Sequence, residues 1–218
     1  MKDYTAGKAW KKERQQSIIE AAYHLFSQRG IEQVLMVEVA KKAGVGHATL
    51  NRYFHSKTDL VVAVSVWAWK EYIAARNASV PEGEVDRFTG REYLLFFMDS
   101  FLDLYRNHSD LLRFNYSFNS FLRYAAGNEE QKRPMTDLVK ILEEQFHTVY
   151  ERGMQDGTLN TDITEETMFS GLFHIMLAAV TRYAVGLVYI SENSPNPENE
   201  LIMLKELLLS RYASQKHT

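Results

Sequence analysis

The chain has 218 residues, a net charge of −3, 45% hydrophobic residues and no cysteine. This length and apolar content are sufficient for a folded, soluble protein with one or two hydrophobic cores. No disulfide framework is possible, and the N-terminal MKDYTAGKAWKKERQQ lacks the apolar stretch of a secretory signal. The composition therefore predicts a cytoplasmic location.

Charge is distributed unevenly along the chain. Residues 1–60 hold ten Lys and Arg against six Asp and Glu, whereas residues 61–218 hold 15 against 22. A basic segment attracts polyanions and an acidic segment repels them. If a nucleic acid is a partner, it should therefore contact residues 1–60.

Three helices are predicted in residues 1–60. The first is about 15 to 20 residues long and ends near Gly30. The second is predicted over Met36–Ala43 and the third over His47–Phe54, with Gly44 in the turn between them. Two short helices across a glycine-containing turn are typical of a helix-turn-helix motif. The apolar stripe of the first helix consists of Ile18, Ala22, Leu25 and Phe26.

The third helix has an unusual outward face. Leu50 and Phe54 lie four positions apart and are expected to point inward, so the polar residues and Tyr53 point outward. A helix of about two turns is unstable alone, and this one carries hydrogen-bond donors where a solvated surface carries Glu and Lys. A short helix with this outward face fits a DNA major groove. A three-helix bundle with an ordinary polar surface is the alternative.

The segments IIEAAYHLFSQRGIEQV and VAKKAGVGHATLNRYFHSKTDLV resemble the DNA-binding domain of TetR-type transcriptional regulators over residues 15–61. The likeness includes Ala-Ala and Leu-Phe in the first helix, Ala-Gly-Val at the turn, and Tyr-Phe and Ser-Lys after the third helix. It implies a helix-turn-helix DNA-binding domain over residues 1–60. A helical effector-binding and dimerisation domain follows over residues 61–218.

The resemblance also implies which residues contact double-stranded DNA. Base-edge contacts are expected from His47, Ala48, Thr49 and Asn51, contacts to either bases or backbone from Arg52, and phosphate contacts from Tyr53 and Lys57.

Three residues depart from the family pattern. Leu35 stands where a Thr usually caps the second helix and contacts a phosphate, and loss of such a cap costs about 1 kcal/mol. Gly46 replaces a frequent Ser cap, and Asn51 replaces a common Tyr. Because Asn can pair with adenine through two hydrogen bonds, the operator is expected to be atypical.

The rest of the chain is also predicted to be helical, which makes the fold all-α. Capping-box patterns begin helices at Ser56 and at Thr89. The four prolines, at positions 81, 134, 195 and 197, are expected at or between helix ends. Later helices are predicted over Asp110–Ala126, Glu130–Gln155, Glu165–Ile190 and Pro197–Ala213.

The segment Met168–Ile190 is apolar for almost its whole length. A membrane span is one explanation. His174, Thr181 and Arg182 in its middle favour a helix buried in a core or a subunit interface. With the Leu-rich LIMLKELLL, it predicts a homodimer through the last two long helices, so that the protein reads an inverted-repeat operator. A monomeric core is the alternative.

Aromatic residues are dense in the second half and predict a pocket for an apolar or aromatic small molecule, although core packing explains any single ring. The candidate ligand-binding residues are Trp67, Phe97, Met98, Phe101, Phe118, Phe121, Phe173 and His174.

No constellation for catalysis is present. The sequence has no glycine-rich phosphate loop, no nucleophile elbow and no His pair at metal-ligand spacing, so no enzyme activity, metal or cofactor is predicted. The predicted function is a ligand-responsive transcriptional regulator, a repressor released from its operator by a small molecule. The alternative is a helical ligand- or partner-binding protein whose helix-turn-helix no longer reads DNA.

Overall fold

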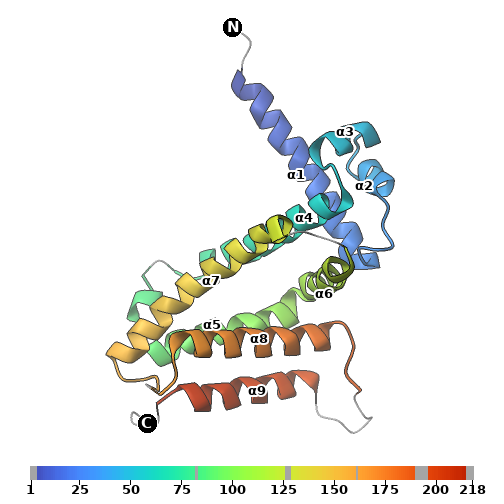
Figure 1. Ribbon diagram of the computed structural model, residues 1–218. Coiled ribbons are helices and arrows are strands. Elements are labelled where there is room, and N and C mark those ends of the chain that lie inside the picture. The colour runs from blue at the N-terminus through green and yellow to red at the C-terminus, as the bar shows by residue number, and fades with distance from the viewer. Residues whose placement is uncertain (1–3, 82, 126–128, 161, 190–195, 215–218) are drawn as a thin grey trace. The chain divides into compact units, whose positions relative to one another are not determined.

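The computed structural model describes residues 4–81, 83–125, 129–160, 162–189 and 196–214, and confirms the all-α prediction (Figure 1). Within these ranges the β-type pairing is a single isolated bridge between Leu159 and Ala213. The helices are α1 (Tyr4–Arg29), α2 (Met36–Lys42), α3 (His47–Tyr53), α4 (Lys57–Ala78), a 3-10 turn (Val85–Arg87), α5 (Gly90–Asn107), α6 (Ser109–Tyr124), α7 (Glu129–Gln155), α8 (Glu165–Ala184) and α9 (Pro197–Tyr212).

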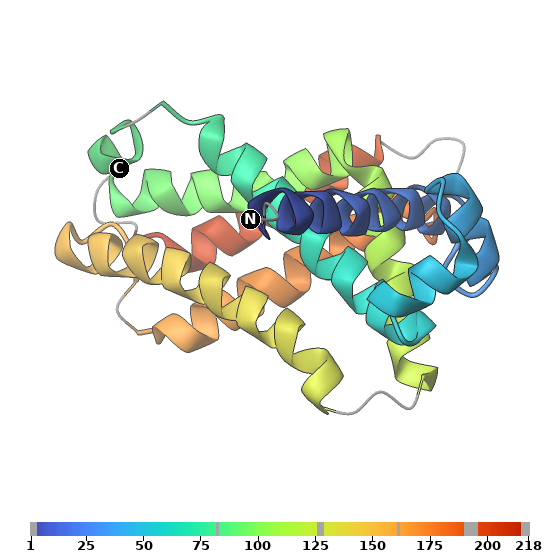
Figure 2. The ribbon, with the colours of Figure 1, turned by 90° about the horizontal axis from the view of Figure 1, so that it is seen from above.

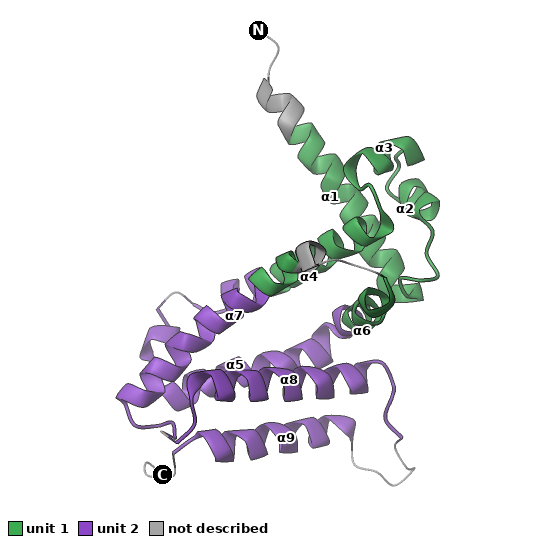
Figure 3. Cartoon of the chain, in the orientation of Figure 1, with its two compact units in different colours: residues 1–72, 113–137 green, residues 73–112, 138–218 purple. Residues whose placement is uncertain are grey.

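The chain divides into two compact units, shown in two colours in Figure 3. Unit 1 comprises residues 1–72 and 113–137, and unit 2 comprises residues 73–112 and 138–218. The division at residue 60 that the resemblance implies stays a prediction. The compact units differ from it, because unit 1 also takes the first part of α4 and the neighbouring parts of α6 and α7.

In unit 1, α1 packs against α2, and α2 packs against α3. Phe26 on α1 stacks on Phe114 of α6, with ring centroids 6.4 Å apart, and both side chains are fully buried. Helix α1 has 26 residues and is longer than predicted. Residues 11–16, KKERQQ, are good helix formers and extend the helix toward the N-terminus beyond the apolar stripe.

Unit 2 is built on α5, α8 and α9, which pack against one another. Helices α8 and α9 lie side by side in Figure 1, and Figure 2 shows the same ribbon from above. A row of aromatic rings forms the core: the centroid of Phe146 lies 5.3 Å from Phe97 and 5.5 Å from Phe169. Rings at these distances in tilted or edge-to-face geometry add to the stabilisation that burial alone provides.

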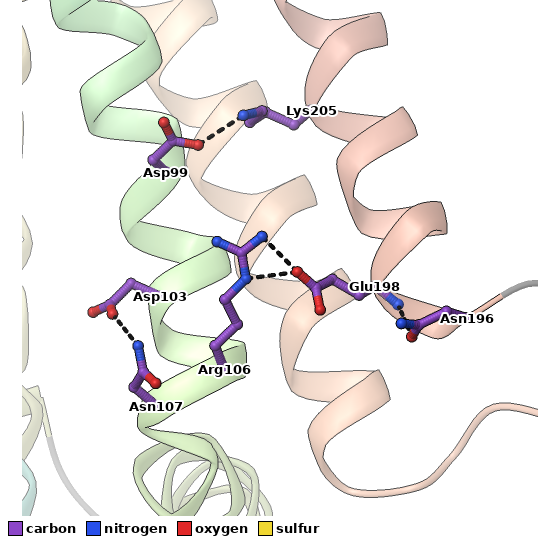
Figure 4. A network of polar contacts seen from close by, with 7 residues as sticks. All are labelled: Asp99, Asp103, Arg106, Asn107, Asn196, Glu198 and Lys205. Carbon is purple, nitrogen blue, oxygen red and sulfur yellow. Dashed lines mark hydrogen bonds and ion pairs between the residues drawn. The ribbon is translucent and has the colours of Figure 1, made fainter.

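Ion pairs join α5 to α9 along the outside of this core (Figure 4). Lys205 Nζ lies 2.7 Å from Asp99 Oδ1, and Arg106 binds Glu198 with Nη2 2.5 Å from Oε1. Glu198 lies in the first turn of α9, where Asn196 caps the helix through the Glu198 N–H. Because most of these side chains are partly exposed, the pairs orient α9 more than they stabilise the fold.

Two expectations about helix ends are wrong. Helix α8 ends at Ala184 although the apolar sequence continues, because Gly186 adopts φ 72° and its N–H and that of Leu187 bind the carbonyls of the last turn. Pro134 lies inside α7, not at an end. Ala126, Ile190 and Pro195 lie outside the described residues.

In the described part of the chain, no helix is both long and apolar enough to span a membrane. The part of Met168–Ile190 that forms α8 packs instead against α5 and α9.

Candidate functional site

The turn between α2 and α3 is set by backbone hydrogen bonds. Gly44 adopts φ 66°, a left-handed conformation that glycine reaches without strain. Its N–H binds the carbonyl of Lys41, and the N–H of Val45 binds the carbonyl of Ala40 at 2.9 Å. This pair of bonds ends α2 and redirects the chain into α3, which confirms the predicted helix-turn-helix.

Helix α3 is held by two side chains and exposes the rest. Leu50 is fully buried and Phe54, its C-cap residue, is almost fully buried, as their spacing predicted. The exposed side chains are His47, Ala48, Asn51 and Arg52, with Thr49 and Tyr53 partly exposed. Six of the seven residues expected to contact DNA therefore share one short helix.

The seventh, Lys57, begins α4 and is engaged within unit 1. Its ammonium donates to the Glu32 carbonyl at 3.3 Å and lies 5.9 Å from the centroid of the Phe121 ring. Burial lowers the pKa of Lys57, and the charges of Glu32 and Glu38 oppose that effect. To reach a phosphate, Lys57 would exchange these partners for the phosphate oxygen.

Leu35 occupies the N-cap of α2 and its side chain, 61% exposed, offers no hydrogen bond. Glu38 supplies the other half of a capping box from inside the helix: its Oε2 accepts the Leu35 N–H at 2.8 Å. Arg29 binds the other oxygen of Glu38 at 2.8 Å. The Arg29 hydrogen bond, followed by that from Leu35, lowers the pKa of Glu38. The start of α2 is therefore ordered without a Thr.

The candidate ligand-binding residues are divided between the two units. Trp67, Phe118 and Phe121 belong to unit 1 and the other five to unit 2. Phe118, Phe97, Met98 and Phe101 are buried core residues. The Trp67 indole N–H is buried and finds no acceptor among the described residues. Phe173 and His174 line a groove between α7 and α8 with a volume of about 540 Å³.

Two features of these sites, a capping residue and an acidic wall, were not predicted from the sequence. Glu38 was not identified as a cap, although its place three residues after the N-cap is the capping-box position. The groove is also lined by Glu143, Glu165 and Glu166, which were not among the predicted ligand-binding residues. Neighbouring Glu residues are common on solvated helices, so no sequence signal marked them.

Residues 18–64 match the family model of bacterial regulatory proteins, tetR family. An HTH-type transcriptional regulator of Staphylococcus aureus strain USA300 is 45% identical over 49 residues, which is 22% of this chain and 26% of that relative. The chain thus matches about a quarter of the length of the curated relatives.

Solved structures extend the likeness to nearly the whole fold. The regulator FadR from Bacillus subtilis in complex with stearoyl-CoA has a TM-score of 0.65 and 19% identity, over 90% of this chain and 98% of that one. A protein from Saccharomonospora viridis, described as a transcriptional regulator and in complex with choline, has a TM-score of 0.72 and 17% identity, over 94% and 100%. The helix-turn-helix of this chain belongs to the tetR family of bacterial regulatory proteins, and the chain has the fold of a TetR-family transcriptional regulator.

Proposed function

We propose that this chain is a ligand-responsive, DNA-binding transcriptional regulator, and that it is a repressor released from its operator by a small molecule. The observation that carries the proposal is the outward face of α3. His47, Asn51 and Arg52 are exposed there, and their side chains make no hydrogen bond within the described residues. Unpaired donors on a helix anchored by buried residues suit base edges in a major groove.

A homodimer is part of this proposal, because a helix-turn-helix protein reads two half-sites about 34 to 36 Å apart. Three large apolar side chains on α8 and α9 are exposed: Ile175 by 44%, Met203 by 56% and Leu207 by 59%. Exposed apolar side chains on neighbouring helices favour a protein contact. A second copy that covers them would pair the last two helices of each subunit.

The small-molecule response is supported by two proteins of the same fold. FadR from B. subtilis is described in complex with stearoyl-CoA, and the S. viridis protein in complex with choline. A ligand that prefers one of two separations of the α3 helices changes DNA affinity by its differential affinity for the two states. This role in DNA regulation implies a cytoplasmic protein without enzyme activity.

The decisive experiment is selection of bound fragments from random DNA at near-physiological salt, followed by sequencing. An enriched inverted repeat is the expected result. The variant Arg52→Ala should lose most of the enrichment, whereas Lys70→Ala, which removes an exposed positive charge from α4, should retain it. Absence of enrichment with and without candidate ligands would overturn the proposal.

The alternative, a helical ligand- or partner-binding protein whose helix-turn-helix no longer reads DNA, has its own observations. Leu35 places an exposed apolar side chain at the start of α2, and Lys57 is occupied by Glu32. The two functions differ in their salt dependence. DNA affinity carried by phosphate contacts from two subunits falls steeply with salt, whereas the alternative predicts weak binding with a flat response.

A further inference from the structure

We propose that the groove between α7 and α8 binds a small organic cation with an apolar body, of the quaternary ammonium type. This proposal rests on the proposed function in one respect: it takes the occupant to be the effector of the regulator. The groove lies entirely within unit 2 and, at about 540 Å³, is large enough for a molecule of several carbon atoms.

The apolar wall of the groove is a pair of stacked rings on α8. The centroids of Phe169 and Phe173 lie 5.4 Å apart at an interplanar angle of 17°. Phe169 also packs against Phe146, with ring centroids 5.5 Å apart, and Phe173 against Phe101, 6.2 Å apart. The face of an aromatic ring attracts a cation, and most strongly where water is excluded.

The polar wall of the groove is acidic. Glu143 comes from α7 and Glu165 and Glu166 from the first turn of α8, while no Lys or Arg of the described residues lines the groove. Glu165 is bound to His147, with 2.9 Å between Oε2 and Nδ1. Glu143 and Glu166 have no hydrogen bond or ion pair in the described part of the chain. Two exposed carboxylates therefore line the groove without an ion-pair partner among the described residues.

Rings and carboxylates together select the class of ligand. The carboxylates would repel an anion. A neutral apolar molecule would displace water from the carboxylates without offering them a hydrogen bond or a positive charge in its place. A bare metal ion needs several converging ligands, and no group of three or more His, Asp or Glu suited to a metal occurs among the described residues. An ammonium with apolar substituents can contact both the aromatic rings and the carboxylates. The Ser170 hydroxyl, whose Oγ lies 3.2 Å from His174 Nδ1, can hydrogen-bond to a polar group on the same ligand.

The test uses benzyltrimethylammonium as the probe and titrates it into the full chain by calorimetry at low salt. The matched anion is benzenesulfonate, and the matched neutral molecule is benzyl alcohol. We expect the cation to bind and to be favoured at least tenfold over both. The double variant Glu143→Gln with Glu166→Gln should weaken binding by a similar factor, while Glu144→Gln, the neighbouring exposed carboxylate on α7, should leave it unchanged.

Three results would overturn the proposal: no binding of the cation at millimolar concentration, equal binding of the neutral molecule, or equal loss in Glu144→Gln. A change of oligomeric state in the double variant, measured by sedimentation, would assign the groove to a second copy instead. Failure here is separable from failure of the regulator function. A protein that enriches an inverted repeat but ignores the cation remains a regulator with a different effector.

Discussion

The backbone N–H of Ile31 donates to the hydroxyl of Ser117, 2.9 Å away, across 86 positions of sequence. Ile31 is fully buried just after α1, where Gly30 turns the chain with φ 80° toward α2. Ser117 lies on α6, within the second stretch of chain that belongs to unit 1. The hydroxyl therefore accepts the N–H that follows the Gly30 turn, outside the hydrogen bonds of α1, and fixes the approach to the helix-turn-helix.

Replacing Ser117 with Ala should destabilise the protein by about 1–3 kcal/mol, because the Ile31 N–H then loses its acceptor. Urea unfolding of the variant measures the change. Ser120→Ala is the control, since Ser120 lies on the same helix and makes no hydrogen bond among the described residues. An equal loss in both variants would show that the Ile31 contact contributes nothing specific.

Gly153→Ala should destabilise unit 2 by about 1–3 kcal/mol or more through overpacking. A Cβ at Gly153 would lie 2.2 Å from Leu159 Cγ, while the Gly90 backbone also approaches Gly153 closely. The double variant with Leu159→Ala should lose less than the sum of the two single losses, because the two shortest contacts, with Leu159 Cγ and Cδ1, are then removed. Additive losses in denaturant unfolding would contradict this assignment.

Asn51→Ala should change the preferred base at its half-site position, with loss of about 1–3 kcal/mol of discrimination. Tyr53→Ala should instead weaken binding to all sequences and reduce the salt slope. Competition binding with the enriched operator and single-base variants, at several salt concentrations, distinguishes the two effects. The reverse pattern would require the roles of Asn51 and Tyr53 to be exchanged.

Leu207→Glu should convert a dimer into monomers, because it places a charge in the apolar contact proposed for α9. The control is Ile141→Glu on α7, which is 39% exposed and lies outside the proposed contact. Sedimentation equilibrium of both variants provides the measurement. A dimer that survives Leu207→Glu but not Ile141→Glu would place the interface on α7.

Glu165→Gln should lower the pKa of His147. The hydrogen bond that His147 donates to the Glu165 carboxylate, and then the charge of Glu165, raise that pKa above 6.5, while burial opposes them and Glu151 adds a smaller contribution. A raised folded-state pKa means that the pair stabilises the protein below pH 6.5 and loses this effect as pH rises through the folded value. NMR titration of the His147 ring measures the change, and Glu166→Gln should leave the pKa in place.

The helix-turn-helix was predictable because local rules decide it. The spacing of Leu50 and Phe54 identifies the buried face of α3, and Gly44 identifies the turn. The end of α8 followed a different rule. Apolar sequence continues past Ala184, yet the left-handed Gly186 ends the helix. Hydropathy alone does not indicate that a left-handed glycine ends a helix inside an apolar segment.

The ligand residues were less predictable because aromatic density does not distinguish core from cavity. Phe97 and Phe173 both looked like pocket residues, but Phe97 is buried against Phe146 while Phe173 reaches the groove. The ammonium of Lys57 contacts the carbonyl of Glu32, 25 positions away in the sequence, and the ring of Phe121. Such pairings form only when distant segments pack together.

The chain contributes to unit 1 twice, first with residues 1–72 and again with residues 113–137. During synthesis the helix-turn-helix therefore leaves the ribosome long before Phe114 and Ser117, which complete its surroundings. A nascent chain that stops before α6 exposes Phe26 and an unpaired Ile31 N–H. The N-terminal segment should consequently reach its final stability only after the middle of the chain has been made.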